Sequence, residues 1–149
     1  MSVSVQAEDF DLGAEVVAMT NGNPDIGAVV TFIGLVRDTT DGTLLSMELE
    51  HYSGMTEQAL SQIEQAATKR WSLSASRVIH RYGNLQTGAQ IMMVATASAH
   101  RKDAFEAAEF LMDYLKTDAP FWKKEHFKDG TKWVASKAAD DAAKDRWST

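Results

Sequence analysis

The order of the predicted helices and strands constrains the fold of this chain more than any other feature. Apolar residues recur at helical spacing over 55–71 and 101–116, which predicts two long helices, and a shorter helix is predicted over 11–20. Period-two or continuous apolar patterns predict strands over 2–8, 27–36, 44–52, 77–82, 90–98, 121–127 and 131–135. Because these elements do not alternate strictly, we predict an α+β fold with a mostly antiparallel sheet.

Side-chain patterns predict several details of the strands. Residues 27–36 are apolar on both faces, which is typical of a central strand. In 44–52, one face is expected to hold Leu45, Met47, Leu49 and His51. A glycine-containing turn near 83–88 is expected to join the strands 77–82 and 90–98.

The two long helices should each bury one apolar stripe. In the first helix the stripe comprises Leu60, Ile63, Ala67 and Trp71, and Ser53 or Thr56 could cap its start. In the second helix it comprises Ala104, Phe105, Ala108, Leu111, Met112 and Leu115. Pro120 biases the preceding residue away from helical geometry, so the second helix must end before it. The Ala/Asp/Lys-rich tail after Ser136 is expected to be peripheral.

Composition narrows the class of protein. With 149 residues, of which 44% are hydrophobic, the chain has the size and apolar content of a single domain, 1–149. Its net charge of −6 disfavours non-specific binding of nucleic acid or of an anionic membrane surface. No apolar run approaches the ~20 residues that span a bilayer, and no secretory signal pattern is present. We therefore expect a cytoplasmic protein that binds neither nucleic acid nor membrane.

Cysteine content and charge distribution bear directly on chemistry. The chain has no cysteine, so it can carry no thiol, persulfide or thiolate metal site of its own. Residues 1–60 hold ten acids and a single base, Arg37, whereas residues 61–149 hold fourteen bases and eleven acids. An anionic ligand is therefore expected at cations of the second part, joined by Arg37.

The motifs typical of phosphate loops, dinucleotide sites, hydrolase nucleophiles and zinc proteases are absent. The four histidines include no pair at the helical i, i+4 spacing, so we expect no metal and no cofactor. His51 and His80 fall in strand patterns, where a structural histidine is the more common outcome.

Three clusters could carry chemistry, and the first is 98–102. It lies at a strand-to-helix junction, where backbone N–H groups and the helix dipole favour an anion. His100 and Arg101 would add donors there, and a solvated helix start explains them equally well.

Another of the three clusters is 31–37, in which an apolar strand opens into a loop at Arg37. The alternative there is a solvated arginine at a strand end.

The second cluster is 113–125. Lys116 ends a helix, where a cation is favourable, and a rigid Ala-Pro turn leads into an extended segment. Lys123 emerges there between aromatic residues, and such surroundings can make a lysine a base or nucleophile at neutral pH. The alternative is an ordinary edge-strand lysine whose ammonium group reaches solvent.

Several segments carry a recognisable pattern in order: 27–37, 49–57, 78–83, 98–101, 104–106 and 112–125. The string YLKTDAPFWK of residues 114–123 is highly specific. Together these segments resemble the MoaE family, the large catalytic subunits of molybdopterin synthase. The resemblance implies an α/β hammerhead-type fold and a homodimer. Each subunit would bind a small ubiquitin-like sulfur carrier, MoaD, in a heterotetramer. The carrier's C-terminal glycine thiocarboxylate would supply sulfur to cyclic pyranopterin monophosphate, making the dithiolene of molybdopterin.

The resemblance also implies roles for individual residues. Lys116 and Lys123 look like the catalytic lysines. Lys116 would contact the carrier's C-terminal group, and Lys123 would act as acid/base or stabilise developing charge. The grip on phosphate and pterin would come from Arg37, His100 and Arg101, and the sequence leaves open whether the last two come from the second subunit. Further residues expected to line the pocket are Leu35, Val36, Lys124 and Glu125.

Other classes of function remain open on sequence grounds. A non-catalytic dimeric module that binds an anion or a peptide tail would need the same cations. An inactive homologue is a third possibility, against which the intact Lys116, Lys123 and Arg37 argue. The absence of cysteine is compatible with sulfur transfer, because a partner would bring the sulfur.

Overall fold

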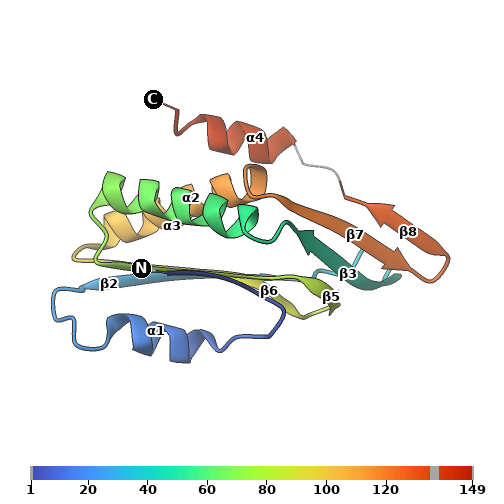
Figure 1. Cartoon of the computed structure of the whole chain (residues 1–149), viewed down its shortest axis with the longest axis horizontal. Coiled ribbons are helices and arrows are strands. Elements are labelled where there is room, and N and C mark those ends of the chain that lie inside the picture. Colours follow the sequence, from blue (N-terminus) through green and yellow to red (C-terminus); the bar gives the residue numbers. More distant parts are fainter. Residues whose placement is uncertain (1, 135–137, 149) are drawn as a thin grey trace.

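The computed structural model describes residues 2–134 and 138–148, which form four helices and eight strands (Figure 1). The helices are α1 (Leu12–Thr20), α2 (Met55–Trp71), α3 (Arg101–Thr117) and α4 (Ala138–Asp145). The strands are β1 (Ser2–Gln6), β2 (Ala28–Leu35), β3 (Leu44–His51), β4 (Ala75–Arg81), β5 (Gly83–Gln86), β6 (Gln90–Ser98), β7 (Phe121–Phe127) and β8 (Gly130–Trp133). The predicted α+β fold is confirmed, and the two long helices end within one residue of their predicted bounds.

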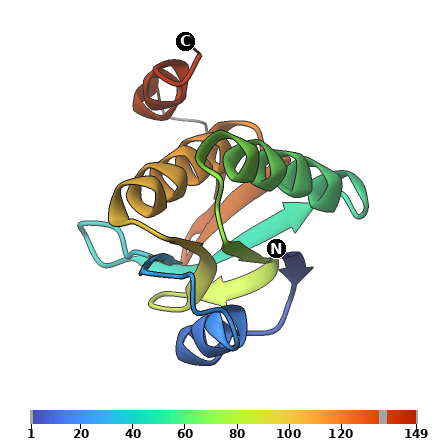
Figure 2. The same ribbon diagram turned by 90° about the vertical axis from the view of Figure 1, so that its left-hand side faces the viewer.

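The strands form two sheets. The first has the order β1-β4-β6-β2, with β1 parallel to β4 and the other neighbours antiparallel. The second has the order β5-β3-β7-β8 and is antiparallel throughout. Helices α2 and α3 cover one face of the first sheet, and α1 covers the other (Figures 1 and 2). Because β7 follows α3 after a short turn, the C-terminal end of α3 lies where the two sheets meet.

The main core lies between the first sheet and the pair α2 and α3. Leu60, Val78, Val94 and Leu111 are fully buried there, and the predicted α2 stripe is buried along its whole length. Each such aliphatic side chain contributes about 1.5–3 kcal/mol through its removal from water. This packing holds α3, and with it Lys116 in its last turn, in a set position over the sheet.

Strand β2 lies at the edge of the first sheet, so the prediction of a central strand is wrong. It pairs with β6 alone among the described residues. Phe32 and Leu35 remain 40% and 54% exposed. The two-sided apolar pattern of 27–36 gave a wrong prediction, because it cannot show whether a strand face is covered by the rest of the chain or left exposed. The strand contains a bulge at Gly34, where the register with β6 shifts between Gly34 and Leu35.

Strand β3 contains a second irregularity, and it corrects the predicted face. The register with β7 shifts between Leu44 and Ser46; these two residues are buried, and Leu45 between them is 57% exposed. A bulge inserts one extra residue and thereby reverses the alternation on one side of it. Only the part of the face after the bulge, Met47, Leu49 and His51, keeps the predicted alternation.

The start of α2 differs from the predicted caps. The N-cap is Gly54, with a positive φ of 86°, and the Glu57 carboxylate accepts a hydrogen bond from its N–H. Thr56 is buried instead, and its hydroxyl donates to the carbonyl oxygen of Pro120 at 3.2 Å. This hydrogen bond ties the start of α2 to the turn between α3 and β7.

Two further predictions need correction. The segment near 83–88 is more than a turn, because it contains β5, which pairs with β3 and places Leu85 opposite Met47. Phe105, which the predicted stripe placed in the core, is 61% exposed. Phe110 lies in the core instead, against the ring of Trp71. The sequence does not predict β5, because its four residues are too few to show a period.

The C-terminal segment packs against α3 where the structure describes it, and Trp147 lies against the main core. The indole N–H of Trp147 donates to Asp113 at 2.7 Å, and its ring packs edge-on against Trp71 and Phe110. Lys144 pairs with Asp118 at 2.7 Å. The last predicted strand ends at Trp133, and its expected final residue, Ala135, lies outside the described residues.

Candidate functional site: a cavity with two lysines

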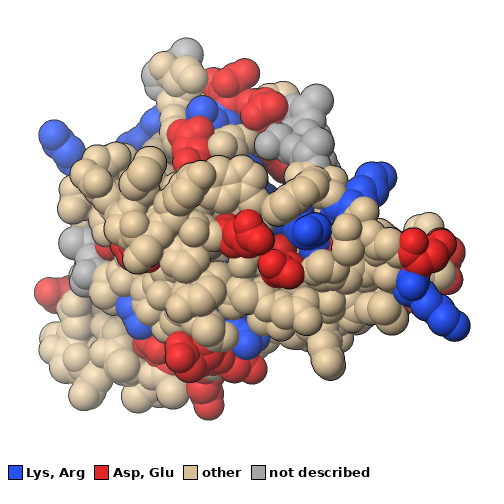
Figure 3. Space-filling model, turned by 45° about the vertical axis from the view of Figure 1, so that its right-hand side comes forward, with Lys and Arg blue, Asp and Glu red and all other residues tan. Residues whose placement is uncertain are grey.

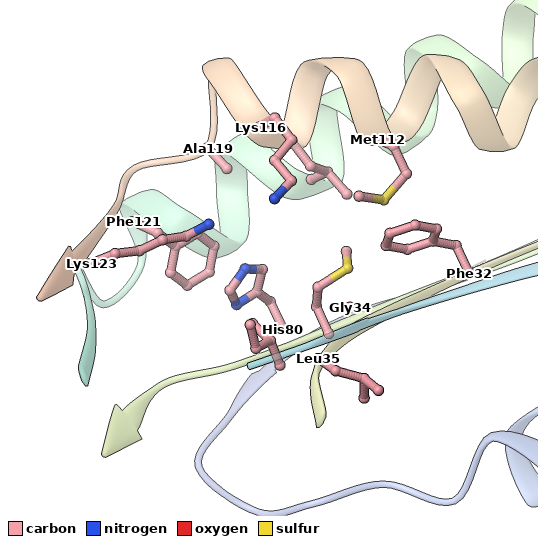
Figure 4. Close-up of a pocket in the computed structure, with 12 residues that line it drawn as sticks. Phe32, Gly34, Leu35, His80, Met112, Lys116, Ala119, Phe121 and Lys123 are labelled. Atoms are coloured by element: carbon pink, nitrogen blue, oxygen red, sulfur yellow. The ribbon is translucent and has the colours of Figure 1, made fainter. Parts of the chain in front are cut away.

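The end of α3, the start of β7 and the first sheet enclose a cavity of about 100 Å³ (Figure 4). Its lining comes from four segments that are far apart in the sequence. The residues are Phe32, Gly34, Leu35, His80, Ile91, Met92, Met112, Leu115, Lys116, Ala119, Phe121 and Lys123. This space is called the lysine cavity below.

Two lysines that are seven positions apart reach the same cavity because the chain reverses between them. Lys116 lies in the last turn of α3, and Lys123 lies on β7 on the same side as Phe121. The reversal is tight, since the Phe121 N–H donates to the Ala119 carbonyl at 2.8 Å. Figure 4 shows both ammonium groups directed toward the space above His80. The structure thus brings the two lysines to one cavity, and their action at one site stays a prediction.

His80 forms the floor of the lysine cavity. Its side chain is only 6% exposed, and its ring stacks on Phe121 with centroids 3.6 Å apart and planes 17° apart. Its Nδ1 lies 2.9 Å from the carbonyl oxygen of Arg81. Burial lowers the pKa of His80 to about 3, and the charges of Lys123 and Lys116 act in the same direction against the opposing hydrogen bond. The imidazole is therefore neutral near pH 7.

Sequence reasoning missed His80 as a lining residue. The pattern of β4 indicates that this position is buried, but one strand cannot reveal what lies across the space in front of it. The available signal was its place within the resembling stretch 78–83, to which no role had been assigned.

The walls of the lysine cavity favour an anion. Most of the remaining lining side chains are apolar, among them Phe32, Met112 and Leu115, and none of the described lining residues is acidic. Electrostatic interactions are stronger in such surroundings than in water.

On the molecular face in Figure 3, acidic and basic side chains gather in small separate groups with large uncharged areas between them. The net charge of the chain therefore says little about the charge at this site.

The other residues predicted for the pocket lie outside its lining, apart from Leu35. Val36 is buried in the core, where its backbone bonds to Gly88 and Ala89, and Arg37 follows it on the exposed loop. Lys124 and Glu125 come next on β7 after Lys123. The Lys124 ammonium group lies 5.1 Å from the centre of the Trp133 ring.

His100 and Arg101 lie at the opposite end of α3 from Lys116. His100 is the N-cap of this helix and makes no capping bond with its side chain. A helix of 17 residues is about 25 Å long at 1.5 Å per residue, so one chain does not bring these residues to the lysine cavity. If they act at such a site, it is the site of a second copy of the chain.

The described residues contain no group of three or more His, Asp or Glu side chains that could hold a metal ion. Within the same residues, no helix is long and apolar enough to cross a membrane.

Comparisons with known proteins agree on one family. The family model described as MoaE protein matches residues 5–118. A curated relative from Cereibacter sphaeroides, the molybdopterin synthase catalytic subunit, is 57% identical over 147 residues, covering 99% of this chain and all of its own length. The solved MoaE protein from Burkholderia ambifaria superposes with a TM-score of 0.86 at 51% identity, covering 99% of this chain and 98% of that one. A complex of subunits 1 and 2 of molybdopterin-converting factor from Helicobacter pylori matches with a TM-score of 0.71 over 92% of this chain and 90% of its own, and at 19% identity it shows the fold alone.

Proposed function

Because this chain belongs to the MoaE family, we propose that its lysine cavity is the active site of a molybdopterin synthase catalytic subunit. The chain is an enzyme of molybdopterin biosynthesis, and the reaction of its family is sulfur transfer. The observation that carries the proposal is the convergence of Lys116 and Lys123 on one cavity whose described lining includes no carboxylate. Two cations in apolar surroundings suit a reaction whose donor and acceptor are both anionic.

The sulfur donor in this proposal is the C-terminal glycine thiocarboxylate of a small ubiquitin-fold carrier of the MoaD type. The chain has no cysteine, so the sulfur must arrive on another molecule. Lys116 contacts the carrier's terminal group, and Lys123 acts as acid/base or stabilises the charge that develops during transfer. The Helicobacter pylori chain of the same fold was solved in a complex of two subunits, and we propose a partner subunit for this chain as well.

The sulfur acceptor is cyclic pyranopterin monophosphate, which becomes the dithiolene of molybdopterin after two transfers. We assign Arg37, His100 and Arg101 to the binding of its phosphate and pterin. Leu35 lines the cavity itself, and Val36, Lys124 and Glu125 are neighbours of lining residues in the sequence. The predicted cytoplasmic location of the reaction stays a prediction.

We propose that two copies of the chain form the homodimer at the centre of a heterotetramer with two carriers. The open edge of β2, with Phe32 and Leu35 exposed beside the lysine cavity, supports an apolar contact between copies. A second copy could also bring His100 and Arg101 to a cavity that they cannot reach in their own chain. Analytical ultracentrifugation of the chain with and without carrier tests this assembly, and a monomer at micromolar concentration would refute it.

The enzymatic part of the proposal has a direct test. The purified chain is incubated with thiocarboxylated carrier and cyclic pyranopterin monophosphate, and mass spectrometry follows the dithiolene product. We expect product to form only when both reactants are present. Carrier and precursor that bind without any product would support the non-catalytic binding module instead.

A further inference from the structure

His80 occupies the floor of the lysine cavity, and the roles assigned so far do not use it. The hydrogen bond made by one ring nitrogen of His80 determines whether the other nitrogen carries a hydrogen. Nδ1 lies 2.9 Å from the backbone carbonyl oxygen of Arg81, which can only accept, so Nδ1 carries the hydrogen of this bond. In a neutral ring Nε2 then has a free lone pair and can only accept a hydrogen bond.

The surroundings of His80 keep the ring neutral. Its side chain is buried, its face is covered by Phe121, and the titratable groups acting on it are Lys123, Lys116 and His51. A proton on Nε2 would add a third positive charge next to two ammonium groups. Both burial and charge repulsion therefore oppose protonation.

The hydrogen-bonding inventory of the lining is one-sided. Lys116 and Lys123 supply ammonium groups, which only donate. The thioethers of Met92 and Met112 are only weak acceptors. Apart from His80 and the two lysines, the other lining residues have apolar side chains or, in Gly34, none. The Nε2 atom of His80 is consequently the one strong side-chain acceptor of the described lining.

Resting on the function proposed above, we propose that His80 is a positioning residue whose Nε2 accepts a hydrogen bond from an ammonium group of the lysine cavity. This contact orients the donor while the ring stays uncharged. A carboxylate at the same place would also orient a lysine, but it would cancel one of the two positive charges. A neutral histidine therefore fits a site that must hold an ammonium group still and remain attractive to anions (Figure 4).

A matched pair of variants separates this role from a structural one. In His80→Gln, the amide oxygen can take the place of Nε2 as acceptor. In His80→Asn, the shorter amide can still donate to the Arg81 carbonyl but does not extend to the cavity. We expect His80→Asn to lower kcat about 10²-fold, as for a misplaced catalytic group, and His80→Gln to stay within about tenfold of wild type. The KM for carrier should be similar in both variants, and thermal unfolding confirms that each is folded.

The outcomes distinguish this inference from the function on which it rests. Wild-type chain that makes no product refutes the proposed function. Wild-type product together with a full kcat for His80→Asn refutes the role of His80 alone. If either variant fails to fold, ¹⁵N NMR of the wild-type imidazole decides the question: a hydrogen on Nδ1 and none on Nε2 between about pH 5 and 8 supports the proposal. A hydrogen on Nε2 in that range overturns it.

Discussion

Replacement of Lys116 by alanine tests the lysine cavity most directly. The side chain is one of two cations that face an apolar space of about 100 Å³. An anion 4 Å from an ammonium group gains about 4 kcal/mol at an effective dielectric constant of about 20. Loss of one preorganised donor to a developing negative charge costs about 2.7–4 kcal/mol in other enzymes. We therefore expect Lys116→Ala to lower kcat about 10²–10³-fold, with Lys123 left in place.

The chain offers a matched control for this variant. Lys69 lies in the last turn of α2 as Lys116 lies in the last turn of α3, and both side chains are exposed. Each substitution removes a cation from a helix C-terminus and should cost a similar ~0.3–1 kcal/mol of stability. Lys69→Ala should keep full activity. The assay is product formation from thiocarboxylated carrier and precursor, measured under single-turnover conditions.

The reasoning would be refuted if Lys116→Ala formed product at a rate within tenfold of Lys69→Ala. Equal unfolding midpoints in urea would show that both variants are folded. A fall in rate that excess carrier restores would instead assign Lys116 to carrier binding alone.

Three further predictions concern other parts of the molecule. Arg37→Ala should raise the KM for the pterin precursor about tenfold and change kcat less, and an unchanged KM would contradict its role as a phosphate grip. Trp147→Ala should lower the free energy of unfolding by about 2–3 kcal/mol, because it removes two edge-to-face contacts and the hydrogen bond to Asp113; unchanged urea denaturation would show that Trp147 does not hold the tail. The folded chain keeps His80 neutral where the unfolded chain binds a proton, so the free energy of unfolding should fall as the pH drops from about 6.5 toward 3. His80→Gln should lose this part of the pH dependence, which amounts to at most about 1.4 kcal/mol per pH unit, and equal slopes would count against the buried neutral ring.

Local patterns predicted the elements that carry Lys116 and Lys123. The end of α3 before Pro120 is a property of neighbouring residues, and it agrees with the structure. The alternation in β7 likewise placed Lys123 with Phe121 on one face. These features depend on spacing along a few residues, which the sequence contains in full.

The errors occurred where distant segments meet. The pattern of β2 could not show that the strand lies at an edge, and that of β3 could not show the bulge that turns Leu45 outward. The stretch from Gly83 to Gln86 became a strand because β3 was there to pair with it. In each case the deciding partner is more than thirty residues away.

Residues close together in the chain already establish that two lysines flank a helix-ending proline, and the composition establishes that the chain has no cysteine. Tertiary structure alone decided that these lysines share one cavity with His80 of β4, and that His100 and Arg101 lie a helix length away. The physical reason is the range of the forces involved. Helix and turn formation depend on residues a few positions apart, whereas the state of a buried imidazole depends on whichever groups the packed core places against it.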